Sequence, residues 1–310
     1  MLSLWRRILS TLAYHSIFDY PLTLDEIHRY LISDSVVLLP TLKKEIDNLL
    51  KTGKIIVTNG FFLPSSLFPL PSSLISLRQH RKDINLKKLI IAKQASRIIS
   101  MIPWVKMVAV TGALAMENTD ENDDIDLMIV TSQNCLWIVR PLAILLISLF
   151  FKRRKPSNHP TYSNHFNHSD HFSYKNHICL NLWLDESTLE IPVSQRNLYT
   201  SHELAQMKPV VNKDGIYERM MWENRWGKKY LANVWKRFEG WKVNRLKRSS
   251  HFQTFDLFSL LNLLSFRLQL WYMKPKMTNE RVSLRSAFFH PGNRTDTILS
   301  KYDRLCHRNI

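Results

Sequence analysis

The sequence predicts a mixed α/β (α+β) protein, with a small mixed sheet in the middle of the chain and helical regions before and after it. Three apolar stretches, "VKMVAV", "LMIVT" and "HICLNLWLDE", have the length and residue types of strands. Helical periodicity dominates before them and again from about Asn197 onward. These shifts predict three parts: an N-terminal unit with its linker at residues 1–77, a sheet domain at 78–195, and a basic helical region at 196–310.

The N-terminal unit carries signals for three helices and a hairpin. Apolar side chains recur at helical spacing over residues 4–13, "TLDE" at residues 23–26 is a capping box, and a third helix follows Pro40 and stops at a glycine. The Asn-Gly pair at residues 59–60 predicts a hairpin turn. This order resembles a winged-helix domain. Because its third helix carries lysines and acidic residues together, it is expected either to bind duplex DNA or to be a packing or protein-binding module.

The connection from the hairpin to the sheet is expected to be a loop followed by a helix. Residues 64–77 are rich in Pro and Ser, which predicts a linker or loop. Helical periodicity then runs from about Arg81 to Met101, and Pro103 marks its end.

A second helix is expected after the central strands, over "LWIVRPLAILLISLFFKRRK" from Leu136 onward. Its uninterrupted apolar part is about half the roughly 20 residues that a membrane span needs. The sequence therefore favours a buried helix packed on the sheet. The alternative is membrane association, with the basic cluster of residues 152–155 held at an anionic surface.

Two aspartates stand two residues apart at the start of a strand that otherwise looks buried. Side chains at i and i+2 of a strand share a face, so Asp124 and Asp126 project together while Ile125 and Leu127 point into the core. Adjacent carboxylates repel each other unless a cation lies between them, and Mg²⁺ prefers carboxylate oxygens and substrate phosphates as ligands. The alternative is an acidic loop edge, in which "ENTDENDD" simply continues.

A glycine turn precedes this acidic stretch. Thr111, Gly112 and Ala113 follow the first predicted strand, and a glycine there allows backbone N–H groups to approach a phosphate closely. A short helix over "ALAM" is expected to point its N-terminus towards the same phosphate.

The spacing of these two motifs resembles the signature of the polymerase-beta-like nucleotidyltransferase superfamily. Gly112-Ala113 is followed, after ten residues, by Asp124-Ile125-Asp126-Leu127, and the resemblance covers about residues 85–195. It implies a small mixed-sheet nucleotidyltransferase domain that moves a nucleoside monophosphate from an NTP to a hydroxyl acceptor. Asp124 and Asp126 would hold one or two Mg²⁺ ions, and Gly112 with Ala113 would cradle the β and γ phosphates.

The chain departs from that family at two positions. Ala113 stands where the family often has Ser, and the strand expected to supply a third carboxylate has Asn181 at its inner polar position. Asn181 is expected to offer a neutral oxygen to the metal, and Asp185 and Glu186 at the strand end are the alternatives. The sequence thus leaves two functions open: an enzyme, or a catalytically weak nucleotide- or DNA-binding regulatory protein.

The remaining candidates for binding residues lie in polar and basic segments. Several histidines precede the third strand and are expected to belong to a surface insertion rather than a metal site, and Cys179 is expected to be a core residue. The histidines are His159, His165, His168, His171 and His177.

The C-terminal region interleaves tryptophans with basic residues over positions 219–250. Such a pattern favours a helical bundle with a solvated basic face, and the alternative is a groove for a polyanionic acceptor strand. Lys208, Arg225 and Lys228 are expected as phosphate contacts.

The overall charge is strongly positive. A formal net charge of +17 favours an anionic partner, such as a nucleotide or a nucleic acid, RNA or DNA. A membrane partner is not expected. Three scattered cysteines argue against a disulfide framework and predict a reducing, cytoplasmic compartment.

Overall fold

The N-terminal unit consists of three helices and a two-stranded hairpin. The computed structural model describes residues 3–65, 71–154, 174–240, 257–277, 280–289 and 294–309. The unit contains α1 (Leu4–Ser16), α2 (Leu24–Arg29), α3 (Leu39–Lys51), β1 (Ile55–Thr58) and β2 (Phe61–Pro64). Their apolar faces form one small core. The three helices and the hairpin predicted from the sequence are all present.

Local signals explain where these elements begin and end. The hydroxyl of Thr23 accepts a hydrogen bond from the backbone N–H of Glu26, and the Glu26 carboxylate accepts one from the backbone N–H of Thr23, so the capping box opens α2. Asn59 and Gly60 both have positive φ, at 52° and 80°, which is the backbone that a type I′ hairpin turn requires.

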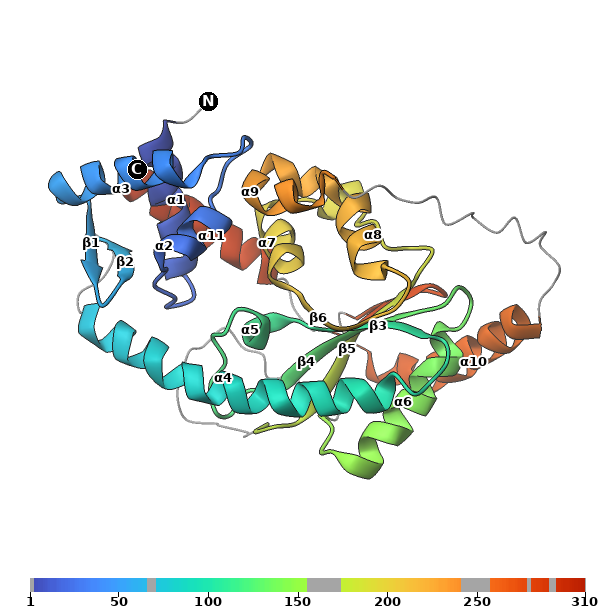
Figure 1. The fold of residues 1–310 in the computed structure, drawn as a ribbon. Coiled ribbons are helices and arrows are strands. Elements are labelled where there is room, and N and C mark those ends of the chain that lie inside the picture. The colour runs from blue at the N-terminus through green and yellow to red at the C-terminus, as the bar shows by residue number, and fades with distance from the viewer. Residues whose placement is uncertain are drawn as a thin grey trace.

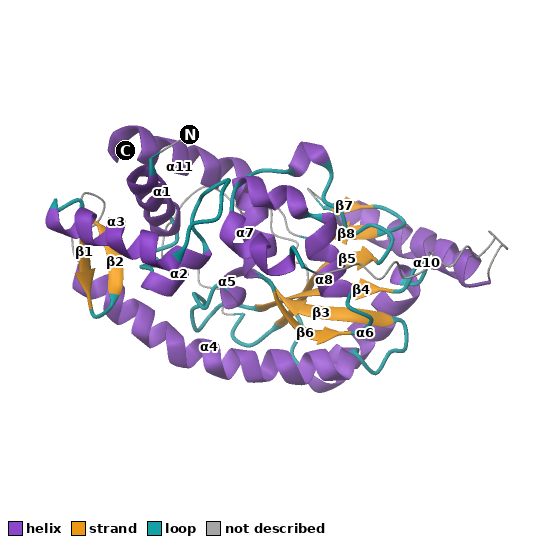
Figure 2. Ribbon diagram, turned by 45° about the horizontal axis from the view of Figure 1, so that its top comes forward, coloured by secondary structure: helices purple, strands orange, loops and turns teal. Residues whose placement is uncertain are grey.

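The centre of the molecule is a six-stranded mixed sheet with the order β6-β3-β4-β5-β8-β7 (Figure 2). Its strands are β3 (Val105–Val110), β4 (Ile125–Thr131), β5 (Ile178–Asp185), β6 (Lys208–Asn212), β7 (Arg281–Val282) and β8 (Ser286–Phe288). β4 and β5 run parallel, and the other neighbouring pairs run antiparallel. The fold is therefore mixed α/β, as the sequence predicts.

Three of these strands lie where the sequence predicts helices. β6, β7 and β8 all come from the region after Asn197, and β6 forms one edge of the sheet beside β3. These strands have five, two and three residues, which is too short for a periodic pattern to appear. Pairing with strands far away in the sequence, rather than local preference, makes them strands.

The helix α4 (Pro71–Ile99) is longer than predicted. Its first residues lie in the Pro- and Ser-rich segment that the sequence predicts as a loop, so that prediction is wrong for residues 71–77. A proline is tolerated in the first turn of a helix because the N–H that it lacks has no partner there. Buried Ile75 belongs to this first part of the helix. In Figure 1, α4 runs from the hairpin along the whole underside of the sheet.

Helices cover both faces of the sheet. Leu127 and Ile129 of β4 point towards α4 and α6 (Leu136–Phe150), whereas Met128 and Val130 point towards the other layer. That second layer contains α7 (Leu198–Gln206), α8 (Ile216–Glu223) and α9 (Ala232–Trp235) (Figure 1). Because side chains on both of its faces are buried, β4 is a central strand with two apolar faces.

The helix α6 is buried on one side only. Its inner residues, among them Trp137 and Ile147, are fully buried on the sheet. On its outer side, Leu145 and Leu149 are 57% and 67% exposed. The sequence predicts a buried helix here, and the structure confirms this for the inner side of α6 only. Among the helices in the described ranges, none has both the length and the apolar composition needed to cross a bilayer.

The first and last helices bring the N-terminal unit into contact with the rest of the chain. The helix α11 (Arg294–Asn309) packs against both α1 and α7, and it lies beside α1 in Figure 1. The ring of Tyr14 in α1 stacks on His202 in α7 with centroids 4.1 Å apart, and it contacts Tyr302 in α11 edge-on at 5.7 Å. Asn233, which lies in α9, accepts a hydrogen bond from the Val37 backbone at 2.9 Å.

Candidate active site

Asp124 and Asp126 converge at the start of β4. Asp124 directly precedes the strand and Asp126 is its second residue, while Ile125 and Leu127 are fully buried. Oxygens of both carboxylates and the sulfur of Cys179 all lie within 4.8 Å of one another. Within the described part of the chain, this is the one cluster of acidic, cysteine or histidine side chains with such spacing. The structure thus brings together the two aspartates that the sequence singles out.

Cys179 belongs to this site, which the sequence does not predict. β5 runs parallel to β4 and pairs Cys179 with Asp126, so the thiol lies beside the carboxylate. The side chain is half-buried, not a core residue. Burial raises the pKa of the thiol, and the charges of Asp126 and Asp124 raise it further, so Cys179 is a neutral thiol at physiological pH.

Asn181 contacts the aspartate pair through a bulge in β5. Leu127 pairs with Leu180 and Met128 pairs with Leu182, which leaves Asn181 as an extra residue between them. Its side-chain nitrogen donates a hydrogen bond of 2.7 Å to Asp126 Oδ1. Asn181 therefore faces the pair with a donor that holds Asp126 in place, and its role as an oxygen ligand to a metal stays a prediction.

The alternative third carboxylates lie away from the pair. Asp185 is at the far end of β5, where it pairs with Thr131. Its carboxylate accepts hydrogen bonds from the backbone N–H groups of Asn134 and Ser187 at 2.6 and 2.8 Å, so it closes local turns. Glu186 accepts from the backbone of the same turn. Neither carboxylate belongs to the cluster of Asp124 and Asp126.

The Gly112 turn lies directly against Asp126. Gly112 has φ +63°, and a Cβ atom at this position would lie 2.6 Å from Asp126 Oδ2. Both the backbone conformation and the contact therefore require glycine. Thr111 is buried, and its backbone N–H donates to the backbone oxygen of Asp126 at 3.1 Å, while the neighbouring Ala113 is exposed. The following helix α5 (Gly112–Ala115) is a single turn.

A fixed positive charge also lies at the site. Arg154 Nη1 is 2.7 Å from Asp124 Oδ2, and the two side chains are 20% and 13% exposed. Backbone hydrogen bonds of Lys152 and Arg154 to Ile178 tie this segment to the start of β5 and so position the guanidinium. The sequence shows the basic cluster after Leu136, but nothing in its local pattern indicates that the chain returns to Asp124.

Three side chains of α4 hold the acidic loop before β4. Arg81, Asn85 and Lys88 recur at helical spacing and so share one face of the helix. Arg81 forms a two-pronged ion pair with Asp120, with distances of 2.8 and 3.0 Å. Asn85 donates to the backbone oxygen of Glu117 at 2.7 Å. The loop is therefore anchored to α4, while Asp120 and Glu121 stay 52% and 61% exposed, as in the acidic edge that the sequence allows as an alternative.

Lys88 is the most deeply buried of these anchors. Its ammonium donates to the backbone oxygens of Asp120 and Asp123, at 2.5 and 2.7 Å, and only 2% of the residue is exposed. Burial lowers the pKa of Lys88, while the charges of Asp123 and Asp124 act in the opposite direction. Because α4 carries many other polar and charged residues, nothing in the sequence distinguishes Lys88 as an anchor of the loop.

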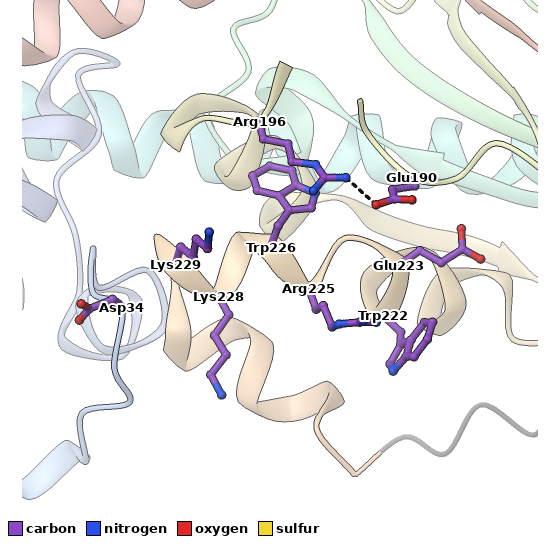
Figure 3. Close-up of a pocket in the computed structure, with 9 residues that line it drawn as sticks. All are labelled: Asp34, Glu190, Arg196, Trp222, Glu223, Arg225, Trp226, Lys228 and Lys229. Carbon is purple, nitrogen blue, oxygen red and sulfur yellow. Dashed lines mark hydrogen bonds and ion pairs between the residues drawn. The ribbon is translucent and has the colours of Figure 1, made fainter. Parts of the chain in front are cut away.

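The three predicted phosphate contacts lie in two separate cavities. Lys208 forms an ion pair of 2.5 Å with Glu117 and lines a cavity of about 170 Å³ between α2 and α5. Arg225 and Lys228 instead line a second cavity, of about 590 Å³, in the layer of α8 and α9 (Figure 3). There the Arg225 guanidinium stacks on Trp222 at 4.4 Å. The structure therefore does not bring these three residues together at one site.

Some predicted features fall outside the described residues. These are four of the five clustered histidines, His159, His165, His168 and His171, and the basic residues of positions 241–250. His177 is described and lies in the turn before β5, where its backbone oxygen accepts from Ile125 at 2.8 Å.

Comparisons of this chain with protein-family models, with curated proteins and with solved structures found no match. What the site does must therefore be inferred from the chemistry of its own residues.

Proposed function

We propose that the chain is a metal-dependent nucleotidyltransferase that moves a nucleoside monophosphate from an NTP to a hydroxyl acceptor. The observation that carries this proposal is the convergence of Asp124 and Asp126 against the Gly112 turn. In this proposal, residues 85–195 form a polymerase-beta-like nucleotidyltransferase domain and the N-terminal unit is a winged helix.

The donor chemistry of the site fits Mg²⁺. Asp124 and Asp126 supply carboxylate oxygens, the ligands that Mg²⁺ prefers, whereas the soft sulfur of Cys179 beside them suits Mg²⁺ poorly. When bound, the ion would neutralise charge on the triphosphate and on the departing pyrophosphate. Asp124 and Asp126 would hold it, and Asn181 would position Asp126.

The glycine turn would accommodate the nucleotide. Because Gly112 has no side chain and Ala113 is exposed, the backbone beside Asp126 stays open to a phosphate group. Arg154 already neutralises part of the negative charge at Asp124, which lowers the repulsion that an incoming triphosphate would meet.

A second candidate function is nucleotide binding without efficient transfer, in a regulatory protein. It is favoured by Asn181, because an amide supplies neither a third anionic ligand nor a base, and by Arg154, which engages Asp124 through an ion pair. In this case the nucleotide would be a signal rather than a substrate.

A transfer assay tests the proposal. Purified chain is incubated with each of the four labelled NTPs, Mg²⁺ and either cellular RNA or cellular protein as acceptor. We expect label transfer, and we expect Asp124→Asn and Asp126→Asn to lower it at least about 100-fold, the scale of a lost charge-stabilising contact. The matched control is Asp83→Asn, which removes an exposed carboxylate of α4 and should leave transfer unchanged.

Binding measurements separate the two candidate functions. Titration calorimetry with Mg²⁺ and NTP that shows binding lost in Asp126→Asn, but no transfer by the parent chain, supports the second function. Asn181→Asp then becomes informative, because a third carboxylate should raise transfer if the missing ligand is the limitation. If neither aspartate variant changes metal or NTP binding, both candidate functions are wrong.

Nucleic acid is a further proposed partner of the N-terminal unit. Lys43 and Lys44 are exposed on α3, and so is Asp47. If α3 enters a groove, Lys43→Glu with Lys44→Glu should weaken duplex DNA binding and flatten its salt dependence in a filter-binding assay. Unchanged affinity would favour a protein-binding role.

A further inference from the structure

The helix α10 (Leu257–Met273) has a mixed inner side, on which Phe266 packs against Trp137 with ring centroids 4.9 Å apart. The side that faces the protein carries polar residues at helical spacing. Asn262 accepts a hydrogen bond from the backbone N–H of Trp137 at 2.8 Å, and Ser265 and Gln269 both donate to the Trp137 backbone oxygen at 2.7 Å. Gln269 also accepts from Arg140 at 2.7 Å. In a helix that only covers a core, this side would be wholly apolar.

The outward side of α10 is apolar. Leu264, Leu268 and Trp271 are 53%, 67% and 76% exposed. A solvated helix face normally carries charged and polar residues, so this arrangement indicates that the outer environment is not water alone.

The neighbouring helix extends this apolar area. α6 and α10 pack against each other beneath the sheet (Figure 1). Leu145, Leu149 and Phe150 of α6 are each more than half exposed on its outer side. We call these three residues, together with Leu264, Leu268 and Trp271, the α6–α10 surface.

The charges on these two helices and the residues just after them are of one sign. Residues 136–154 and 257–277 contain no Asp or Glu, whereas Lys152, Arg267, Lys274 and Lys276 are exposed there. An apolar surface whose own helices carry only basic charges is complementary to an anionic lipid surface, which offers acyl chains and negative headgroups together.

The aromatic residues and the helix length fit the same partner. Trp271 and Tyr272, both exposed, stand at the end of α10 just before Lys274 and Lys276, the order in which aromatic and basic side chains occur at the level of lipid headgroups. At 17 residues, α10 is about 25 Å long, shorter than the roughly 30 Å hydrocarbon core. It suits a helix that lies in the interface.

We propose that the α6–α10 surface docks the protein on an anionic lipid bilayer. The apolar side chains enter the boundary between headgroups and acyl chains, and the lysines contact the headgroups. This inference is independent of the proposed transfer reaction, because none of its residues belongs to the aspartate cluster.

Co-sedimentation with vesicles tests the proposal. The full chain is mixed with vesicles of phosphatidylcholine alone or with 30% phosphatidylserine. We expect binding to the anionic vesicles, at least tenfold weaker binding to the neutral ones, and release at high salt. Lys274→Glu with Lys276→Glu should weaken binding about 25-fold or more, since each basic residue near the surface contributes roughly fivefold.

Apolar variants test insertion. Leu264→Gln with Leu268→Gln should abolish vesicle binding, whereas Met101→Gln with Val193→Gln should not, although Met101 and Val193 are 75% and 76% exposed. All four positions are on the surface, so unchanged circular dichroism is expected. Brominated lipids should quench fluorescence in the parent chain more than in Trp271→Phe.

Several outcomes would overturn the proposal. Absence of binding to either vesicle, equal binding to both, or binding that persists in Leu264→Gln with Leu268→Gln would each do so. If analytical ultracentrifugation instead shows a dimer that this double variant dissociates, and the parent chain does not bind vesicles, the surface is an interface between two copies.

Discussion

Asp126 has three neighbours that act on it in different ways. Asn181 donates a hydrogen bond to one carboxylate oxygen, Gly112 brings the backbone of the turn against the other, and Cys179 lies within reach of both aspartates. The hydrogen bond stabilises the charged carboxylate, whereas that charge opposes ionisation of the thiol. The reactivity of Cys179 therefore reports on the charge of the site.

Alkylation of Cys179 should respond to the charge of Asp126. Burial and the two carboxylates raise the pKa of Cys179, so little thiolate forms at pH 8. Asp126→Asn removes one negative charge, lowers this pKa and should increase the rate of iodoacetamide labelling several-fold, followed at each cysteine by mass spectrometry. Buried Cys135 is the internal reference. An unchanged rate would contradict the assigned cause.

At the residue scale, the sequence predicts some contacts and not others. The common direction of Asp124 and Asp126 follows from strand periodicity alone. The contact of Asn181 depends on a bulge, which arises only when β5 pairs with β4. The ion pair of Arg154 with Asp124 depends on the path of the chain after α6. Neither of these contacts has a local signature.

The helix α4 sets the position of the acidic loop, and with it the position of Asp124. At the element scale, the clearest prediction concerns the contacts of Lys88 with this loop. Lys88→Met removes the donor to two backbone oxygens of the loop, Asp120 O and Asp123 O. A part-buried acceptor left without its donor costs about 1–3 kcal/mol, so losing both should lower the free energy of unfolding by about 2–6 kcal/mol in urea titrations.

The matched control is Lys87→Met, because Lys87 is the exposed neighbour on the same helix. It should change the free energy of unfolding by less than about 0.5 kcal/mol. Equal effects of the two variants would show that the Lys88 contacts to the loop carry no stability.

At the element scale, caps and turns were the reliable signals. The capping box of Thr23 and the turn at Asn59 and Gly60 are local, so the sequence contains all the information that fixes them. Pro71 was misleading because proline both breaks helices and opens them. The short strands β6, β7 and β8 were missed because only their partners in the sheet make them strands.

At the scale of the whole molecule, two histidines lie where α1 of the N-terminal unit meets α7. His15 and His202 are each 1% exposed, their ring centroids are 5.2 Å apart, and their ring nitrogens have no hydrogen-bond partner. Burial lowers the pKa of His15 to about 3, with a further contribution from Arg78, and burial lowers that of His202 well below its usual value. Both are neutral in the folded protein.

This interface should be sensitive to acid. Both histidines have a lower pKa folded than unfolded, so below about pH 6.5 the unfolded chain takes up protons that the folded chain does not. Stability is complete above that pH and should fall by about 1.4 kcal/mol per histidine for each pH unit towards pH 3. Urea unfolding at pH 7.5, 6.0 and 5.0 measures this slope.

Replacing His202 by phenylalanine should reduce the slope of the free energy of unfolding against pH. His202→Phe keeps a ring against Tyr14 and removes one of the two titrating groups, so about half of the loss between pH 6 and pH 5 should disappear. His80→Asn replaces an exposed histidine and is the control. If the slope is the same in both variants, other groups determine the acid sensitivity.

The position of α11 has a consequence for synthesis of the protein. It packs against α1, although nearly 280 residues separate the two helices in the sequence. While the chain leaves the ribosome, the side of α1 that meets Tyr302 stays bare until residues 294–309 have emerged. The helix α1 therefore gains all of its contacts only after α11 has been made, and chaperones have access to that side until then.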